Sequence, residues 1–299
     1  MGNLSRRSIL SGMASATGAT LAAGAGFPPV RSAWAAEGKL ILAFIPQENP
    51  EKLLGDIDVI TAYLSDAIDM PIEGFVTLDH AAAVEALRAG TADISFTGAL
   101  PYVFANAAFG AEVLLAEVYR GESTYTSRLF VRKDSGLKTL DDLRGKTMAF
   151  ADPISESGYL YPLEILAEAG LLDPDADPHA FFGQVYFAGG YQQAIQAVAN
   201  GLVDVAGVSE FSDMLLTPEQ QTEVRWIAES KPIPSHAVIV RPGLDEKLKV
   251  AFKQAMLGLN EPENRYLLKH VYGPDGYVGT DHQAYAPVAE IARRYGLLG

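Results

Sequence analysis

The sequence predicts an α/β protein of two lobes that are joined by two crossover strands. Short apolar runs of strand length alternate with segments whose apolar residues recur at three- and four-residue spacing. This alternation restarts near residue 128, and a further strand-like run at 236–240 follows the second set. Strands that alternate with helices favour parallel sheets with crossover connections. Two such units with a late returning strand indicate one lobe at 37–127 plus 236–299 and another at 128–235.

The first unit begins with an apolar run, Lys39 to Ile45, that Pro46 closes. Apolar residues from Leu53 to Ile68 then follow the spacing of an amphipathic helix. Gly90 ends a later helix, as glycine commonly does at a helix C-terminus. The expected strands of this unit are 39–45, 71–76, 93–96 and 111–118, and the expected helices are 53–68, 81–89 and 99–109.

The second unit repeats the pattern. We expect strands at 128–131, 146–150, 185–187, 204–208 and 236–240, and helices at 140–143, from about 156 to 168, and at 191–200, 245–259 and 287–295. In open α/β sheets, ligands lie beyond the carboxyl ends of the strands. The loops that follow these strands are therefore the expected place of a binding site.

The N-terminal segment 1–35 is expected to be an export signal. Arg6 and Arg7 precede a weakly apolar stretch at 11–26, and Ala33-Trp34-Ala35 has the A-x-A form of a cleavage site. This order resembles a twin-arginine signal and predicts export to the periplasm. No cysteine follows the site, so a lipid anchor there is not expected, and no later stretch reaches the ~20 apolar residues that span a membrane.

Composition excludes several function classes. The net charge of −14 becomes −17 once the three arginines of segment 1–35, which contains no acids, are removed. Such acidity argues against nucleic acid or an anionic membrane surface as a partner. The chain has no cysteine, which excludes disulfides and a thiolate nucleophile. Neither a Gly-rich nucleotide loop nor H-E-x-x-H occurs in the sequence, so an enzyme is not expected.

The segment 151–162 carries the strongest functional signal. It follows a strand and opens a helix, and it places the hydroxyls of Ser155 and Ser157 at the helix N-terminus. A helix N-terminus has free N–H donors and a partial positive charge, which favour an anion. Between the two serines stands Glu156, whose negative charge occupies the place of that anion. Two interpretations remain open: Glu156 stabilises the helix start, or it contacts a ligand that carries positive charge.

A long run of residues resembles a known family. It extends from Tyr125 to Leu137, continues from Leu140 to Lys146, and includes Phe150 to Pro153 and Gly189-Gly190. In these segments the chain is similar to the phosphate/phosphonate/phosphite-binding proteins of ABC importers, which have the type II periplasmic binding-protein fold. The resemblance implies a solute-binding protein that closes two lobes over one small ligand and docks as a monomer on a permease, or on a sensor kinase. It implies no cofactor.

The resemblance also implies where the ligand binds. The first lobe would contribute the loop after the first strand, the turn at 78–80 and Tyr102, and the second lobe the serine motif, the next helix start and the segment around Glu210. Together with the aromatic and acidic residues near them, the candidate ligand-binding residues are Glu48, His80, Tyr102, Tyr125, Ser155, Glu156, Ser157, Tyr191 and Glu210.

This sequence departs from the family pattern at three points. Glu156 replaces the middle residue of the usual Ser-Thr-Ser, Tyr191 replaces a histidine, and His80 replaces a tyrosine. Two negative charges ~4 Å apart repel by about 4 kcal/mol at an effective dielectric of ~20, and a dianion doubles this. A plain phosphonate is therefore not the expected ligand.

Two alternative ligand classes follow from the acids and aromatics. The carboxylates of Glu48, Glu156, Glu210 and Asp213 can form an oxygen-rich site for Ca²⁺ or a lanthanide, which would then be the ligand and not a cofactor. The rings of Tyr102, Tyr125 and Tyr191 can instead face an organic cation.

Overall fold

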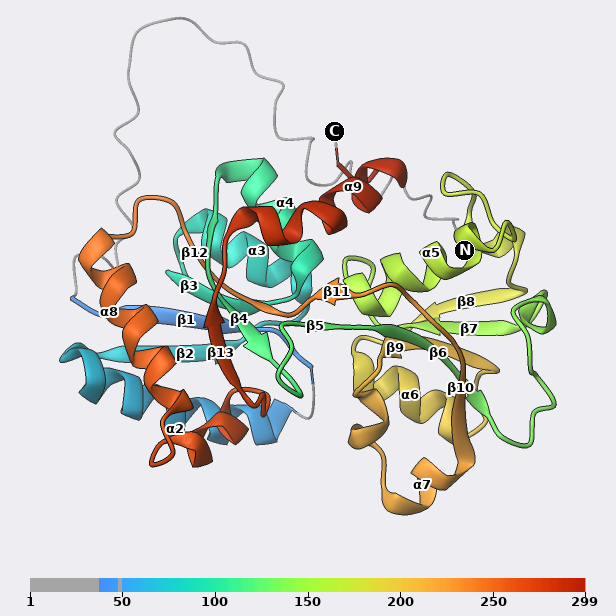
Figure 1. Cartoon of the computed structure of the whole chain (residues 1–299), viewed down its shortest axis with the longest axis horizontal. Coiled ribbons are helices and arrows are strands. Elements are labelled where there is room, and N and C mark those ends of the chain that lie inside the picture. The colour runs from blue at the N-terminus through green and yellow to red at the C-terminus, as the bar shows by residue number, and fades with distance from the viewer. Residues whose placement is uncertain (1–37, 48–49, 299) are drawn as a thin grey trace, which may run out of the picture.

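The computed structural model describes residues 38–47 and 50–298. The predicted export signal and Glu48 lie outside these residues. None of the helices in the described part is long and apolar enough to cross a membrane. Figure 1 shows two lobes side by side, each built around its own sheet. The predicted bilobal α/β architecture is therefore confirmed, while the limits 37–127 plus 236–299 and 128–235 remain a proposal about where the chain divides.

The first lobe contains a six-stranded mixed sheet in the order β13-β4-β12-β3-β1-β2. Its strands are β1 (Leu40–Phe44), β2 (Ile72–Val76), β3 (Ile94–Thr97), β4 (Glu112–Val118), β12 (Ala237–Val240) and β13 (Gly276–Gly279). β1 runs parallel to β2 and β3 and lies between them, and all five of its residues are buried. A strand covered on both faces reads as a continuous apolar run, as this one does.

The second lobe contains a five-stranded sheet in the order β10-β6-β9-β7-β8. Its strands are β6 (Ser127–Arg132), β7 (Thr147–Phe150), β8 (Gln184–Phe187), β9 (Val205–Ser209) and β10 (Val224–Glu229). β7 is parallel to β8 and β9, whereas β6 is antiparallel to β9 and β10.

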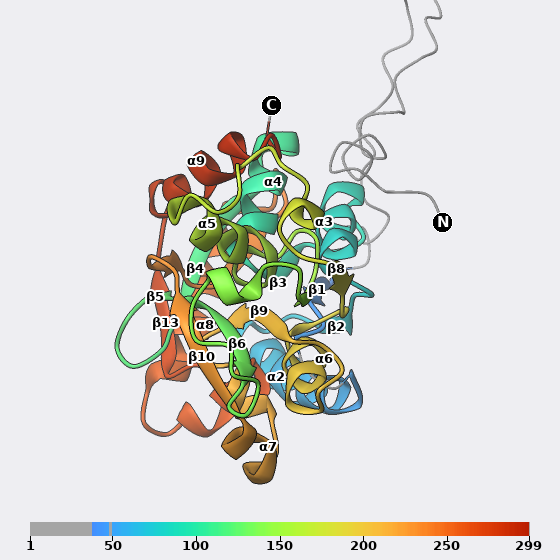
Figure 2. The same cartoon turned by 90° about the vertical axis from the view of Figure 1, so that its right-hand side faces the viewer.

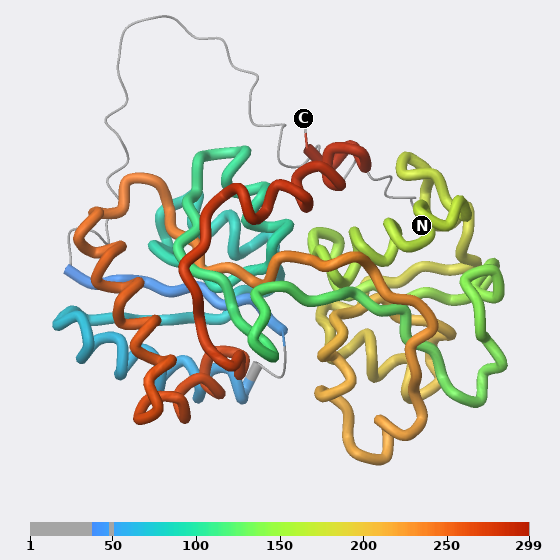
Figure 3. Tube along the Cα trace, in the orientation of Figure 1, coloured from blue at the N-terminus to red at the C-terminus, as the bar shows by residue number. Residues whose placement is uncertain are grey.

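Two crossing segments connect the lobes. β5 (Thr124–Tyr125) and β11 (Ile233–Pro234) pair antiparallel in a two-stranded sheet of their own. In Figure 3 the chain passes from one lobe to the other along these two neighbouring segments. Two short neighbouring connections between rigid bodies form a natural hinge.

The helices cover both faces of the two sheets. They are α2 (Pro50–Ile68), α3 (His80–Ala89), α4 (Ala99–Phe109), α5 (Tyr161–Glu168), α6 (Tyr191–Ala199), α7 (Pro218–Glu223), α8 (Glu246–Leu257) and α9 (Ala286–Arg294). In Figure 2 α3, α4, α5 and α9 lie above the sheets, and α2, α6 and α7 lie below them. One buried apolar cluster on the upper side includes residues of both lobes, among them Leu100, Leu163 and Val288. The two lobes thus share part of their core.

Several elements differ from the sequence prediction. The sheets are mixed rather than parallel, because β12 runs antiparallel to β3 and β6 runs antiparallel to β9. β10 and β13 were not expected from the sequence, and the two expected crossover strands, β5 and β11, were not assigned to residues. β5 and β11 are only two residues long, and β13 begins and ends with glycine, so neither apolar periodicity nor strand propensity marks them. Their pairing is decided by the neighbouring strands.

Candidate functional site

The serine motif forms a π-helical turn at the interface of the lobes. This turn, Glu156–Leu160, lies between β7 and α5, and the Ser155 hydroxyl caps it by accepting from the Gly158 N–H at 3.0 Å. A Cβ atom at Gly158 would lie 2.5 Å from the Ala151 side chain, so this tight turn requires glycine. Ser155, Glu156 and Ser157 all have 0% exposure, so the motif is enclosed by protein.

The Glu156 carboxylate reaches from the second lobe to a helix N-terminus of the first lobe. Its Oε2 accepts a hydrogen bond from the Leu100 N–H of α4 at 3.2 Å. The N-cap of α4 is Gly98, which has no side chain to cap the helix. A Cβ atom at Gly98 would lie 2.7 Å from Glu156 Oε1 and closer still to Oε2. An internal carboxylate therefore occupies the position where the N-terminus of an 11-residue helix favours an anion.

A chain of hydroxyl groups from the second lobe and from the crossing segment β5 leads to this carboxylate. The Tyr125 hydroxyl lies 2.8 Å from Oε1 and donates to it, because an ionised carboxylate only accepts hydrogen bonds. The same hydroxyl lies 3.1 Å from the Ser157 Oγ. The Tyr191 hydroxyl contacts Ser155 at 2.9 Å and Ser157 at 3.1 Å. Glu156 is thus the acceptor at the end of a chain of four hydroxyls.

His236 supplies the positive charge. Its Nε2 lies 3.1 Å from Glu156 Oε1, in an approach that makes an ion pair rather than a well-aligned hydrogen bond. Burial raises the pKa of Glu156, but the His236 ring outweighs burial and holds that pKa at about 2. Burial lowers the pKa of His236, and the Glu156 carboxylate reverses this and raises it above the ordinary value. The two residues therefore form a buried carboxylate–imidazolium pair.

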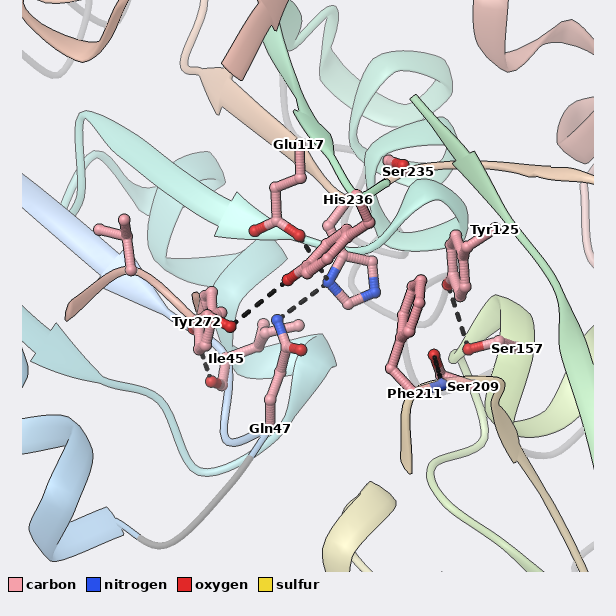
Figure 4. Close-up of polar contacts among 12 residues, drawn as sticks. Ile45, Gln47, Glu117, Tyr125, Ser157, Ser209, Phe211, Ser235, His236 and Tyr272 are labelled. Carbon is pink, nitrogen blue, oxygen red and sulfur yellow. Dashed lines mark hydrogen bonds and ion pairs between the residues drawn. The ribbon is translucent and has the colours of Figure 1, made fainter. Parts of the chain in front are cut away.

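A second buried carboxylate, Glu117 of β4, lies on the other side of the same ring. Its Oε2 lies 3.9 Å from His236 Nδ1, and the side-chain amide of Gln47 lies 2.9 Å from that nitrogen. In Figure 4 Glu117 and Gln47 are on one side of His236, and Tyr125 with Ser157 is on the other. Burial raises the pKa of Glu117 to about 7, against the opposing effect of His236.

A cavity of about 150 Å³ lies between the lobes beside Glu117 and His236. The first lobe lines it with Glu117, Tyr119 and Tyr272, and the second lobe with Tyr191, Phe211 and Ser212. Tyr125, Ser235 and His236 line it from the crossing segments. A solute in this cavity would contact residues of both lobes.

The structure brings most of the sequence-predicted residues together. Tyr125, Ser155, Glu156, Ser157 and Tyr191 form the connected cluster described above. His80, the first residue of α3, is 2% exposed, and its ring lies 6.4 Å from that of Tyr191.

Other predicted residues lie elsewhere. The Tyr102 hydroxyl bonds His282 at 3.0 Å and its ring packs against Tyr285, so Tyr102 belongs to the core of the first lobe and does not line the cavity. Glu210 accepts from the Thr126 N–H at 3.0 Å and pairs with Arg128 at 3.3 Å, which makes it part of a surface ion-pair group.

The described residues of the predicted carboxylate metal site are not grouped around one point. In the described part of the chain, no group of three or more His, Asp or Glu residues is placed to hold a metal ion. Glu156 pairs with His236 and Glu210 pairs with Arg128, so each acid is already neutralised by a nearby base. Asp213 is not joined to either of them in such a group, and Glu48 lies outside the described residues.

Sequence reasoning missed His236, Glu117, Phe211 and Tyr272. One signal was available for His236, because it stands at the start of the strand that returns to the first lobe, where a crossing segment enters the cleft. Glu117 had no signal, since it is one acid at the end of an apolar run.

Comparison with known proteins agrees with this geometry. Residues 42–285 match the family described as ABC transporter, phosphonate, periplasmic substrate-binding protein. The chain is 33% identical over 171 residues to the phosphate-import protein PhnD of Mycolicibacterium smegmatis, covering 55% of this chain and 53% of that one. It thus spans about half the length of that relative. It is 29% identical to the phosphonates-binding periplasmic protein of Escherichia coli over 78% of this chain and 70% of that one.

Solved structures have the same fold. PhnD1 of Prochlorococcus marinus, in complex with methylphosphonate, superposes with a TM-score of 0.77 at 17% identity over 87% of this chain and 99% of that chain. A binding-protein component of an ABC phosphonate transporter of Pseudomonas aeruginosa gives 0.76 at 22% identity over 85% of each chain. These relatives are substrate-binding proteins of transporters and not enzymes, as was expected for this chain. With a family match over more than half of its length, two sheets joined by two crossing segments and a cavity between them, the chain belongs to the periplasmic substrate-binding proteins of phosphonate-type ABC transporters.

Proposed function

We propose that this chain is the solute-binding component of an ABC importer whose ligand is not a plain phosphonate. In this proposal the protein is exported by the twin-arginine route, binds one small solute between its lobes as a monomer, and delivers it to a permease. Family membership and a cavity lined from both lobes support the transport role.

The observation that carries the ligand assignment is the position of Glu156. Its carboxylate accepts from the Leu100 N–H and the Tyr125 hydroxyl, which are donors suited to an oxyanion. His236, the cation beside it, is already paired with it at 3.1 Å. A phosphonyl group in the same place would meet a negative charge and no free cation. Repulsion of about 4 kcal/mol per charge would lower affinity by roughly a factor of a thousand for an unpaired Glu156. The His236 cation offsets part of this repulsion, and the donors that Glu156 already occupies add to what remains.

Calorimetric titration tests this assignment. Wild type, Glu156→Thr and the control Glu122→Thr are each titrated with phosphate, phosphite and methylphosphonate. Glu122 is exposed and its replacement changes the net charge equally. We expect weak binding by wild type and control, and tighter binding by Glu156→Thr. The gain is partial, since Tyr191 offers no imidazole. Sub-micromolar methylphosphonate binding by wild type, unaffected by Glu156→Thr, would overturn the proposal.

Solution scattering tests the closure. A bound solute should reduce the radius of gyration, because it contacts residues of both lobes. Unchanged dimensions at saturation with a tightly bound solute would contradict the hinge mechanism.

A further inference from the structure

We propose that the interlobe cavity binds a small alkylammonium solute that carries a hydroxyl or similar polar group, with Glu117 as its counter-ion. This inference rests on the proposed function, because it names the solute that the same cleft would take.

The cavity has the size and position for a small solute. Its volume of about 150 Å³ is well above the roughly 10–15 Å³ that one water needs. Its walls come from both lobes and from the crossing segments, so an occupant bridges the hinge. A solute of several non-hydrogen atoms fits this space.

The charges that line the cavity favour a cation. Among the described residues that line it, Glu117 is the carboxylate and His236 is the basic group. His236 is closer to Glu156, at 3.1 Å, than to Glu117, at 3.9 Å, and Glu156 does not line the cavity. The Glu156–His236 pair is therefore neutral as a unit. Among the described residues, the one remaining acid at the cavity wall is Glu117, and a cation bound beside it favours its ionised form.

Aromatic rings form much of the remaining wall. Tyr119 stacks on Phe211 with ring centroids 4.7 Å apart, and Tyr125 stacks on Phe211 at 6.4 Å. Tyr191 and Tyr272 also line the cavity. Ring faces attract ammonium groups, and they do so more strongly where water is excluded. The guanidinium of Arg120 already lies 5.3 Å from the centroid of Phe211, which shows that this ring accepts a cation.

Two buried serines indicate that the solute carries a polar group. Ser212 and Ser235 line the cavity, are 2% and 1% exposed, and have hydroxyls without a hydrogen-bond partner among the described residues. Buried hydroxyls are normally paired, because leaving one unpaired costs its lost hydration. A hydroxyl-bearing solute supplies the missing partner.

Choline and its uncharged isostere 3,3-dimethylbutan-1-ol test the proposal, since the two differ in charge and hardly in shape. We expect wild type to bind choline at least tenfold more tightly than the isostere. Glu117→Gln keeps the shape of the side chain and should lower choline affinity at least tenfold, while affinity for the isostere stays within about twofold. Glu122→Gln, an exposed acid five residues along the chain, should change neither. Phe211→Leu keeps an apolar wall and should lower the choline-to-isostere ratio.

The outcomes separate this inference from the proposed function. Equal binding of choline and isostere, or no binding of either at 10 mM, overturns the alkylammonium proposal even if phosphonates are rejected. Tight methylphosphonate binding that is independent of Glu156 overturns the proposed function whatever choline does. A folded Glu117→Gln variant with wild-type choline affinity removes Glu117 as the counter-ion. Thermal melting of each variant verifies folding before titration.

Discussion

The two carboxylates on either side of His236 are both buried, yet their environments differ sharply. Glu156 is 0% exposed and Glu117 is 3% exposed. Glu156 receives a backbone N–H, a tyrosine hydroxyl and the close Nε2 of His236, and its pKa is held at about 2. For Glu117, whose nearest His236 nitrogen is 3.9 Å away, burial prevails and raises the pKa to about 7. Burial alone therefore does not decide the charge of an acid; its compensating partners do.

Because of this difference we assign the two acids different roles: Glu156 serves the structure, and Glu117 serves ligand binding. Glu156 connects the second lobe to the Leu100 N–H of the first lobe and is paired with His236. Glu117 faces a cavity and lacks such full compensation, so it gains most from a cation that arrives from outside. The predictions below test this division of roles.

The largest expected effect is that of Glu156→Gln on folding. The substitution leaves His236 buried without its partner, and breaking a buried pair in this way costs about 3–5 kcal/mol. Urea unfolding measures the loss. The matched variant Glu122→Gln, at an exposed site, should stay within about 0.5 kcal/mol. A loss below about 1 kcal/mol for Glu156→Gln would show that the pair does not stabilise the fold.

The pH dependence of stability should distinguish the two acids. The depressed pKa of Glu156 gives a stabilising contribution that is present above its ordinary pKa of 4.5 and is lost as the pH falls toward about 2. The raised pKa of Glu117 has the opposite sign, so stability is lost as the pH rises from 4.5 through about 7. The stability that is lost as Glu117 ionises is up to about 3 kcal/mol.

Glu117→Gln provides the control for that measurement. It should remove most of the loss between pH 4.5 and pH 7 and leave the acid side unchanged. The part that persists belongs to His236, whose raised pKa also makes stability fall as the pH rises. If the two proteins have the same profile above pH 4.5, Glu117 is already ionised in the folded protein.

Gly98→Ala should cost about 1–3 kcal/mol, because the new methyl group would lie 2.7 Å from Glu156 Oε1. In the Glu156→Thr background the shorter side chain removes the clash, so the same substitution should cost less. Denaturant unfolding of the four proteins gives the coupling. Additive effects would mean that the carboxylate does not lie at the start of α4.

The smallest expected changes in stability are those of substitutions at two buried serines, Ser157 and Ser212. Ser157→Ala removes hydrogen bonds to Tyr125 and Tyr191 and should cost about 1 kcal/mol. Ser212→Ala removes a hydroxyl that has no partner among the described residues, so it should be neutral or slightly stabilising without solute. Thermal melting of both variants measures these changes in stability. A larger loss for Ser212→Ala would indicate that its hydroxyl is engaged in the solute-free protein.

The sequence identified the serine motif of the site but not the residues His236 and Glu117. The motif at 155–157 was visible because small hydroxyl residues between a strand and a helix are an unusual local pattern. The sequence could not decide the surroundings of Tyr102, because a tyrosine in an apolar helix has the same local pattern in a core as in a cleft. In the structure its hydroxyl bonds His282. The sequence could not decide whether the acids form a metal site, because their spacing along the chain does not reveal that bases lie beside Glu156 and Glu210.

By itself the sequence determined the alternation of strands and helices, the two-lobed architecture and the presence of a carboxylate between two serines. These features depend on local apolar periodicity and on residue type. The tertiary structure alone decided what that carboxylate does, because its partners are distant in the chain: Leu100 lies 56 residues away, and Tyr125 lies 31 away. Charge state and pairing depend on burial and on these distant neighbours, and neither is encoded in the local sequence.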